Sequence, residues 1–286
     1  MKNVINVRHI YKYFGNQEIL HDINFEIKQN EIFMLLGPNG AGKSTFLNIL
    51  SGALKPDSGA IDYSFENQNK NFNIKKNIGM VFQNGLLDDS LTVKENLLLR
   101  GGFYHNNKFQ LNKAYTEVIE LTSIKNIINK KYGCLSGGQK RKCDIARALI
   151  GCPRLLIMDE PTASLDKSAC DELYKTIFEL KKNKAVTIII STHNYNEIKY
   201  ADNIAIIENG RNISTNIAFN NIGASLIIYT INSDVLEKCL IKNNIHYLKL
   251  SDKFLIALDN PFTALSYINK LRSYITTFEI TDYLNR

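Results

Sequence analysis

A glycine-rich segment, GPNGAGKST at residues 37–45, limits the possible folds of this chain more than any other part of its sequence. It fits the pattern G-x-x-x-x-G-K-[ST] through Gly37, Gly42, Lys43 and Ser44. The apolar run EIFMLL precedes it, and FLNILSG follows with apolar residues at helical spacing, ending at Gly52. A buried strand that enters a helix through such a turn is typical of α/β proteins with a parallel sheet.

The segment has the chemistry of a phosphate-binding loop. Its glycines let successive backbone N–H groups turn toward phosphate oxygens, and the helix N-terminus adds a partial positive charge. Lys43 would reach the terminal phosphates of a nucleotide, and Ser44 would coordinate magnesium. A glycine-rich turn with an exposed lysine is the alternative, but it leaves the complete motif unexplained. The other residues of the predicted ATP cradle are Pro38, Asn39, Gly40, Ala41 and Thr45.

Two acidic residues, Asp159 and Glu160, follow a second apolar run, LLIM, at residues 155–158. At the end of a buried strand, Asp159 could hold magnesium and Glu160 could orient and polarise an attacking water. The pair could instead cap the next helix. The phosphate loop upstream favours the catalytic interpretation.

The segment LSGGQ at residues 135–139 is a second glycine-rich motif. Its backbone amides and Ser136 could approach a γ-phosphate, yet the chain already has one phosphate cradle. The motif therefore suggests a site that another copy of the chain completes, through Ser136, Gly137, Gly138 and Gln139.

Apolar periodicity predicts alternating strands and helices around these motifs. Short strands are expected within residues 4–36, a helix over 171–183 and a buried strand at AVTIII, residues 185–190. From about residue 88 to 140 the pattern is helical, which predicts an inserted helical subdomain.

The pattern of predicted strands and helices changes after Arg211. Residues 216–286 read as β-α-β-β-α-β, the order of a small α+β ferredoxin-like domain. We expect Ser233 to cap its first helix, a hairpin turn at Ser251 and Asp252, and a second helix from Pro261. This region lacks phosphate-binding glycines and paired carboxylates, so dimer contact or regulation is its expected role. A passive domain that adds only stability is the alternative.

Composition narrows the class of protein. The net charge of +7 is spread along the chain, which favours a solvated surface over a nucleic-acid footprint and leaves a weak contact with an anionic membrane leaflet open. Five cysteines without a C-x-x-C pair indicate neither a disulfide framework nor a zinc site. No apolar stretch approaches the roughly 20 residues of a membrane span, and the N-terminus does not resemble a secretory signal. We expect a cytosolic protein.

Six motifs together resemble those of the ATP-binding-cassette (ABC) ATPases in content and order. They are GPNGAGKST, VFQ at 81–83, LSGGQ, LLIMDEP at 155–161, SLD at 164–166 and STH at 191–193. The resemblance covers about residues 3–215. It implies a P-loop ABC ATPase domain over residues 1–215, with the helical subdomain inserted, followed by the small domain over 216–286.

The resemblance also implies roles for single residues. Gln83 would sense magnesium and the lytic water, and His193 would hydrogen-bond the γ-phosphate. Asp166 would communicate across a dimer interface, although capping of the next helix explains it equally well. Phe14 would stack on adenine, with the adjacent Tyr13 as the other candidate.

The chain looks most like ATPase subunits of bacterial drug, antibiotic or bacteriocin-immunity exporters. Two copies would sandwich two ATP molecules with Mg²⁺ and power a separate transmembrane permease from the cytoplasmic face of the membrane, with no nucleic-acid partner. An importer ATPase, a soluble ABC protein acting on ribosomes or DNA, and a nucleotide-dependent regulator without turnover are the alternatives. The presence of both Glu160 and His193 argues against the last.

Overall fold

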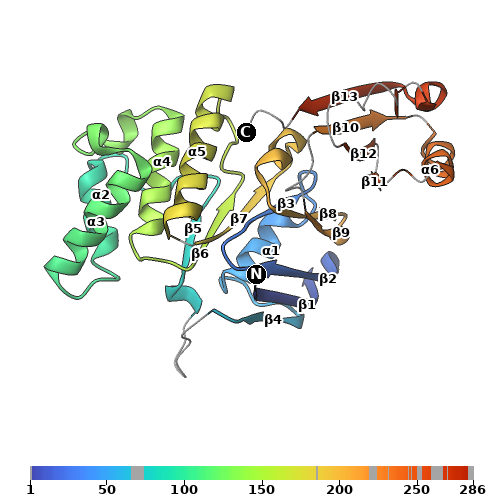
Figure 1. Ribbon diagram of the computed structural model, residues 1–286. Coiled ribbons are helices and arrows are strands. Elements are labelled where there is room, and N and C mark those ends of the chain that lie inside the picture. Colours follow the sequence, from blue (N-terminus) through green and yellow to red (C-terminus); the bar gives the residue numbers. More distant parts are fainter. Residues whose placement is uncertain are drawn as a thin grey trace. The chain divides into compact units, whose positions relative to one another are not determined.

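The computed structural model describes residues 2–65, 74–184, 186–218, 224–230, 232–243, 245, 247–249, 253–258, 267–268 and 270–282. The chain divides into two compact units, Met1–Ile217 and Ala218–Arg286. Figure 1 shows the elements of both. The predicted α/β fold with a central, largely parallel sheet is confirmed in the first unit.

The centre of the first unit is a six-stranded sheet in the order β5-β6-β7-β3-β8-β9. The pairings of β5 with β6, β6 with β7, β7 with β3 and β3 with β8 are parallel. Three of these strands are buried along their whole length, as strands covered on both faces must be. The strands are β3 (Ile32–Leu36), β5 (Ile78–Val81), β6 (Leu155–Asp159), β7 (Thr187–Thr192), β8 (Asn203–Glu208) and β9 (Arg211–Ala218).

An antiparallel sheet of β1 (Asn3–Phe14), β2 (Gln17–Lys28) and β4 (Ser58–Tyr63) lies beside it in the order β2-β1-β4. The expectation of short strands in this region was wrong, because β1 and β2 each run for 12 residues. Their pairing contains four register shifts, and such irregularities interrupt the strict alternation of apolar and polar residues by which a long strand is recognised.

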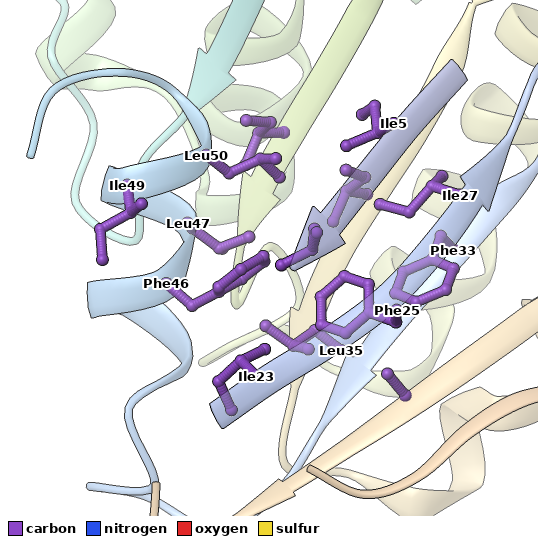
Figure 2. Close-up of a cluster of buried hydrophobic side chains, with 14 of the residues drawn as sticks. Ile5, Ile23, Phe25, Ile27, Phe33, Leu35, Phe46, Leu47, Ile49 and Leu50 are labelled. Atoms are coloured by element: carbon purple, nitrogen blue, oxygen red, sulfur yellow. The ribbon is translucent and has the colours of Figure 1, made fainter. Parts of the chain in front are cut away.

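Helix α1 (Lys43–Leu50) packs into a core shared with both sheets, shown in Figure 2. The ring of Phe25 from β2 lies 5.2 Å from that of Phe33 on β3 and 5.0 Å from that of Phe46 on α1, measured between centroids. Through Phe25, these contacts connect the middle of α1 to β3. The glycine-rich segment between them is thereby held on a rigid base.

The remaining helices of this unit are α2 (Val93–Gly101), α3 (Lys108–Thr122), α4 (Gly137–Leu149) and α5 (Lys167–Lys184). Figure 1 shows α2 and α3 beyond α4, on the side away from the antiparallel sheet. Helix α5 begins four residues before the expected start at Asp171, because the Asp166 carboxylate accepts a hydrogen bond from the backbone N–H of Ala169 at 2.8 Å. Short 3-10 turns occur at η1 (Ile74–Lys76), η2 (Lys125–Ile127), η3 (Tyr132–Cys134) and η4 (Tyr195–Tyr200).

The second unit contains a four-stranded antiparallel sheet in the order β11-β12-β10-β13 around its own core of Leu226, Ile228, Leu236 and Phe254. Its elements are β10 (Ala224–Tyr229), α6 (Ser233–Lys242), β11 (Tyr247–Lys249), β12 (Lys253–Leu258), η5 (Arg272–Tyr274) and β13 (Thr277–Asp282).

Three expectations concerned the helices and turn of this unit. The predicted cap at Ser233 was wrong: the side chain of Asn232 accepts the hydrogen bond from Val235, and Ser233 is the first helical residue. Residues 267, 268, 270 and 271 are helical, whereas Pro261 and the turn at Ser251 and Asp252 lie outside the described residues. Among the described helices of the whole chain, none combines the length and apolar character needed to cross a bilayer.

Candidate functional site

A pocket of about 440 Å³ opens where β3 ends and α1 begins. Most of its lining comes from the glycine-rich segment, joined by residues from β2, from the segment after β5 and from the segment after β6. The pocket thus gathers residues from positions that are widely separated in the sequence. Its lining residues are Ile19, Asn39, Gly40, Gly42, Lys43, Ser44, Thr45, Gln83 and Glu160.

Gly42 immediately precedes α1, and only glycine fits this position without strain. Its φ is +101°, and a Cβ atom there would lie 2.7 Å from Cδ2 of Leu20. Gly37 meets a different constraint, because a Cβ atom at this position would lie 2.0 Å from the carbonyl oxygen of Ile207. The two glycines therefore let the backbone of the loop lie directly against β2 and β8.

Lys43 is the first residue of α1, and its ammonium group is directed into the loop. Its Nζ donates hydrogen bonds to the carbonyl oxygens of Gly37 at 2.8 Å and Pro38 at 2.9 Å. Burial lowers the pKa of Lys43, and the carboxylate of Glu160 partly opposes that effect. The side chain is 4% exposed, so the loop holds a nearly enclosed positive charge.

The two acidic residues lie at the carboxyl end of β6, beside β7 in the sheet. The Oγ of Ser191 donates to Oδ1 of Asp159 at 2.5 Å and accepts from the backbone N–H of Glu160 at 2.9 Å. Glu160 has a φ of +45°, a left-handed conformation that is uncommon for a residue with a Cβ atom. Ser191 fixes both acidic residues, a role that its place in the STH motif did not reveal.

Glu160 brings two other predicted residues together. Its Oε1 lies 3.5 Å from Nζ of Lys43 and 3.3 Å from Nδ1 of His193. Glu160 is 13% exposed and His193 is 48% exposed, so the carboxylate is recessed while the imidazole is accessible to a ligand. One carboxylate, one ammonium and one imidazole thus converge beside the start of α1.

The aromatic residues expected to stack on adenine, Tyr13 and Phe14, do not line this pocket. Both rings are exposed, and the hydroxyl of Tyr13 donates to Glu18 at 2.8 Å. Sequence reasoning missed Ile19, which does line the pocket. Its position near the start of β2, three residues after the turn between β1 and β2, was the available signal.

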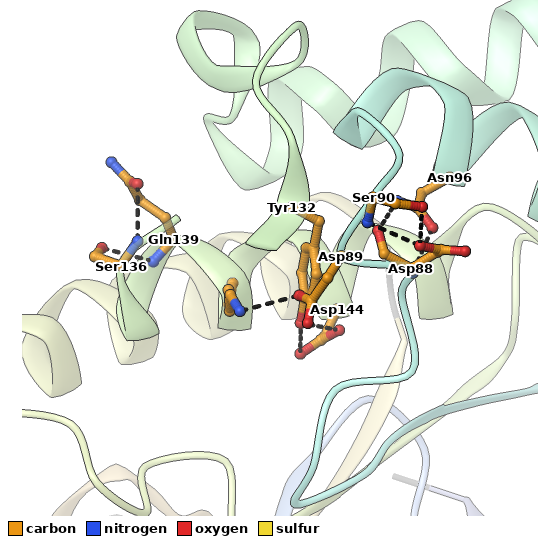
Figure 3. Close-up of polar contacts among 9 residues, drawn as sticks. Asp88, Asp89, Ser90, Asn96, Tyr132, Ser136, Gln139 and Asp144 are labelled. Atoms are coloured by element: carbon orange, nitrogen blue, oxygen red, sulfur yellow. Dashed lines mark hydrogen bonds and ion pairs between the residues drawn. The ribbon is translucent and has the colours of Figure 1, made fainter. Parts of the chain in front are cut away.

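The LSGGQ segment forms the start of α4, and Figure 3 shows its hydrogen bonds. The Oγ of Ser136 accepts from the backbone N–H of Gln139, while the side chain of Gln139 accepts from the backbone N–H of Ser136 at 3.2 Å. This reciprocal pair is a capping box, which fixes the helix start. Ser136 and Gly137 remain exposed.

A second pocket of about 350 Å³ lies beside this helix start. It shares no lining residue with the pocket at the phosphate loop. Asp166, which caps α5, lies in its wall together with the glycines of LSGGQ. Its lining residues are Ser136, Gly137, Gly138, Gln139, Lys142, Ser164, Leu165, Asp166, Ser168, Ala169 and Glu172.

Two arginines of α4 connect this helix to the segment that carries Gln83. Arg141 donates to the carbonyl oxygens of Phe82 at 2.7 Å and Gln83 at 3.0 Å, and Arg147 donates to the carbonyl oxygen of Met80 at 2.5 Å. Both arginines are buried. The segment 80–83 is therefore tied to α4 through its main chain.

A buried acid lies between the two arginines on α4. Tyr132 donates its hydroxyl proton to Asp144, as Figure 3 shows, at distances of 3.0 and 3.1 Å to the two carboxylate oxygens. Burial raises the pKa of Asp144, and it also raises the pKa of Tyr132. Neither residue was singled out from the sequence, because nothing in the spacing shows that they meet.

The phosphate loop between β3 and α1, and the acidic pair after β6, define a P-loop ATPase. Residues 20–163 match the ABC transporter family profile. The chain belongs to the ABC transporter family and is an ATP-binding subunit with an ABC ATPase domain, so the family resemblance and the predicted ATPase activity are confirmed.

Relatives in this family have different transport roles. A Nod factor export ATP-binding protein I of Rhizobium sp. (strain N33) is 36% identical over 216 residues, which cover 74% of this chain and 70% of the relative. A methionine import ATP-binding protein of Clostridioides difficile is 33% identical over 213 residues, with 72% and 66% covered. An ABC transporter A family member of Dictyostelium discoideum is 43% identical over 190 residues, 65% of this chain, yet the chain spans only 22% of that protein.

Solved structures give the same fold. One is cbiO1 of Clostridium perfringens, described as part of the ABC transporter complex cbiONQ, with a TM-score of 0.69, 28% identity and coverage of 85% of this chain and 96% of that one. Another is an ATP-binding cassette solved as a dimer in a post-hydrolysis state with ADP and Pi, with a TM-score of 0.63, 27% identity and coverage of 73% and 97%.

Proposed function

We propose that two copies of this chain close head to tail around two ATP molecules and thereby drive a separate membrane permease. The observation that carries the proposal is the presence of two pockets without a common lining residue, one at the phosphate loop and one at LSGGQ. Within one chain, LSGGQ does not line the nucleotide pocket. A second copy in the opposite orientation would supply Ser136, Gly137, Gly138 and Gln139 to the γ-phosphate, and Asp166 to the contact between copies.

The residues of the first pocket, together with His193 and Phe14 from outside its lining, take distinct roles in this proposal. The backbone amides of the loop and the ammonium group of Lys43 hold the phosphates. Glu160 orients and polarises the attacking water, and His193 donates a hydrogen bond to the γ-phosphate. Phe14 stacks on adenine, since the neighbouring Tyr13 is engaged with Glu18.

Magnesium fits the oxygen donors in and beside this pocket. Ser44 and Gln83 line it and offer a hydroxyl and an amide oxygen, while the carboxylate of Asp159 lies at the end of β6, outside the lining but next to Glu160. Oxygen ligands of these kinds are the ones that Mg²⁺ prefers, usually with phosphates and water completing the shell. Among the described residues there is no group of three or more His, Cys, Asp or Glu residues that could hold a metal without the nucleotide. When bound, the ion neutralises charge on the phosphates.

We further propose that the chain works at the cytoplasmic face of the membrane and that transport is outward. The Nod factor relative, named for export, supports this direction. Import is the second candidate, and the methionine relative favours it. Part of the support for a permease partner comes from cbiO1, which belongs to a transporter complex.

Two measurements test these proposals. Affinity capture of the tagged full chain from detergent-solubilised membranes should recover a membrane-spanning protein. Reconstitution of that pair in vesicles with ATP on the outer face should then give net substrate uptake into the vesicle lumen, which corresponds to export from the cell. Recovery of ribosomes without any membrane protein would contradict the permease coupling, and ATP-driven flux out of preloaded vesicles would establish import.

A further inference from the structure

A buried carboxylate lies behind the two residues proposed to act on the γ-phosphate and the water. Glu197, on η4, is 5% exposed, and three side chains donate hydrogen bonds to it. They are Thr162 to Oε1 at 2.7 Å, Asn194 to Oε1 at 3.3 Å and Tyr174 to Oε2 at 2.6 Å. All three donors are uncharged groups, so hydrogen bonds from neutral side chains compensate this carboxylate for the water it loses on burial.

The donors come from three different segments. Thr162 is two residues after Glu160, on the chain leaving β6. Asn194 immediately follows His193, on the chain leaving β7. Tyr174 lies on α5, is 1% exposed, and its ring stacks on that of Tyr200 with centroids 3.8 Å apart. Glu197 therefore joins the segment of Glu160, the segment of His193 and a helix that is packed into the core.

Glu160 and His193 depend on such a connection. Strands β6 and β7 are paired up to Asp159 and Ser191, so both residues lie just beyond the last paired positions of their strands. Glu160 also has the left-handed φ of +45°, a conformation that persists only where the surroundings impose it. Ser191 constrains Glu160 from the strand side, and the bond from Thr162 to Glu197 constrains the chain on its other side.

We infer that Glu197 is a positioning residue for ATP hydrolysis, acting through Thr162 on Glu160 and through Asn194 on His193. The inference rests on the proposed roles of Glu160 and His193. Because nucleotide binding depends mainly on the phosphate loop, loss of the hydrogen bond between Thr162 and Glu197 should lower kcat and leave KM for ATP nearly unchanged.

Thr162→Val is the sharpest test, because it removes one hydroxyl at nearly constant volume. In the purified full chain we expect about a 10-fold lower kcat with KM within about 2-fold of the unchanged protein. Thr162→Ser keeps the hydroxyl and should restore most of kcat. Tyr174→Phe removes the other short bond to the carboxylate but lies on α5, so its effect on kcat should be smaller.

Glu197→Gln and Glu160→Gln complete the design. Glu197→Gln keeps the shape of the side chain but loses acceptor capacity. Combined with Thr162→Val, it should lower kcat no further than the stronger single variant, since the bond that Thr162→Val removes is one of those that Glu197→Gln already weakens. The inference would be overturned if Thr162→Val kept the wild-type kcat, or if Thr162→Ser failed to restore kcat. It would also be overturned if KM for ATP rose as much as kcat fell. If Glu160→Gln retained full turnover, the proposed catalytic role would fail; if only that variant were inactive, the positioning role alone would fail.

Discussion

Nζ of Lys43 lies 3.5 Å from Oε1 of Glu160, although the two residues are separated by most of the ATPase domain's sequence. The contact joins the start of α1 to the end of β6. A bound nucleotide would offer Lys43 a stronger partner in its terminal phosphates. Lys43 would then turn from Glu160 toward the phosphates, leaving the carboxylate available to water.

Glu160→Gln should leave ATP binding intact while slowing hydrolysis about 100-fold or more, since a neutral amide polarises water poorly. It should also accumulate an ATP-bound dimer. Phosphate release assays and size measurements with ATP test both results. Near-normal hydrolysis by the purified variant would remove Glu160 from the catalytic role.

Ser136→Arg should abolish turnover and leave ATP binding by the monomer nearly unchanged, because Ser136 lines a pocket separate from the phosphate loop. The change also removes a helix cap worth about 1 kcal/mol, so circular dichroism should establish that the fold is intact. Gln110→Arg, on the exposed start of α3, adds the same charge elsewhere and should be silent. Loss of nucleotide binding by a folded Ser136→Arg monomer would place Ser136 in the same chain's site.

Gly42→Ala should lower the free energy of unfolding by about 1–3 kcal/mol through its left-handed backbone, with the contact to Leu20 adding to the loss. Gly40→Ala is the matched control, because Gly40 also has a positive φ, +80°, but a Cβ atom there meets nothing within 4 Å. Urea unfolding without nucleotide measures the free energy of unfolding of both variants and of the unchanged protein. Equal losses would show that the close approach to β2 is unimportant.

Cys143 gives a stability prediction with a defined pH window. Burial raises the pKa of its thiol to about 12 in the folded protein, whereas an unfolded cysteine ionises near pH 8.5. The unfolded state therefore loses this proton first, and above pH 8.5 stability should fall by up to about 1.4 kcal/mol per pH unit from this group.

The comparison between variants isolates that effect. Cys143→Ala should flatten the decline in the free energy of unfolding between pH 8 and 10, measured with urea. Cys134→Ala, at an exposed cysteine, should leave the decline as it is. An identical slope in all three proteins would contradict the assignment to Cys143.

A chain ending near Asn216 should still bind ATP but associate less well or lose regulation. ATP binding should persist because the second unit has its own core and contains none of the residues proposed to bind nucleotide. Weaker association or lost regulation is expected because dimer contact or regulation is the role proposed for this unit. Size measurement with ATP in the Glu160→Gln background, and turnover with the permease, provide the test. If truncated and full chains dimerise and turn over identically, the second unit is a passive addition.

The parts of the site that were predictable from sequence are those whose residues are close together along the chain. The loop from Gly37 to Thr45 carries its own strand, glycines and helix start, so its chemistry can be read from one short segment. Asp159 and Glu160 were recognised because they end an apolar run. Local spacing was sufficient in both cases.

Contacts between distant segments were not predictable in this way. Thr162 meets Glu197 across 35 positions, and Arg141 meets the carbonyl oxygen of Phe82 across 59. Such partners depend on the order of strands in the sheet, which apolar periodicity does not specify. For α5, the boundary drawn from apolar periodicity was wrong, whereas the alternative that Asp166 caps this helix is confirmed.

The arginines of α4 hold residues 80–83 by carbonyl oxygens, and every residue type supplies a carbonyl oxygen. Replacement of Phe82 by another side chain therefore leaves all three acceptors in place. Apart from Gln83, for which a magnesium contact is proposed, the side chains of this segment can therefore change while its attachment to α4 persists. Relatives that transport very different substrates could thus keep the hydrogen bonds between α4 and this segment and vary only the segment's exposed side chains.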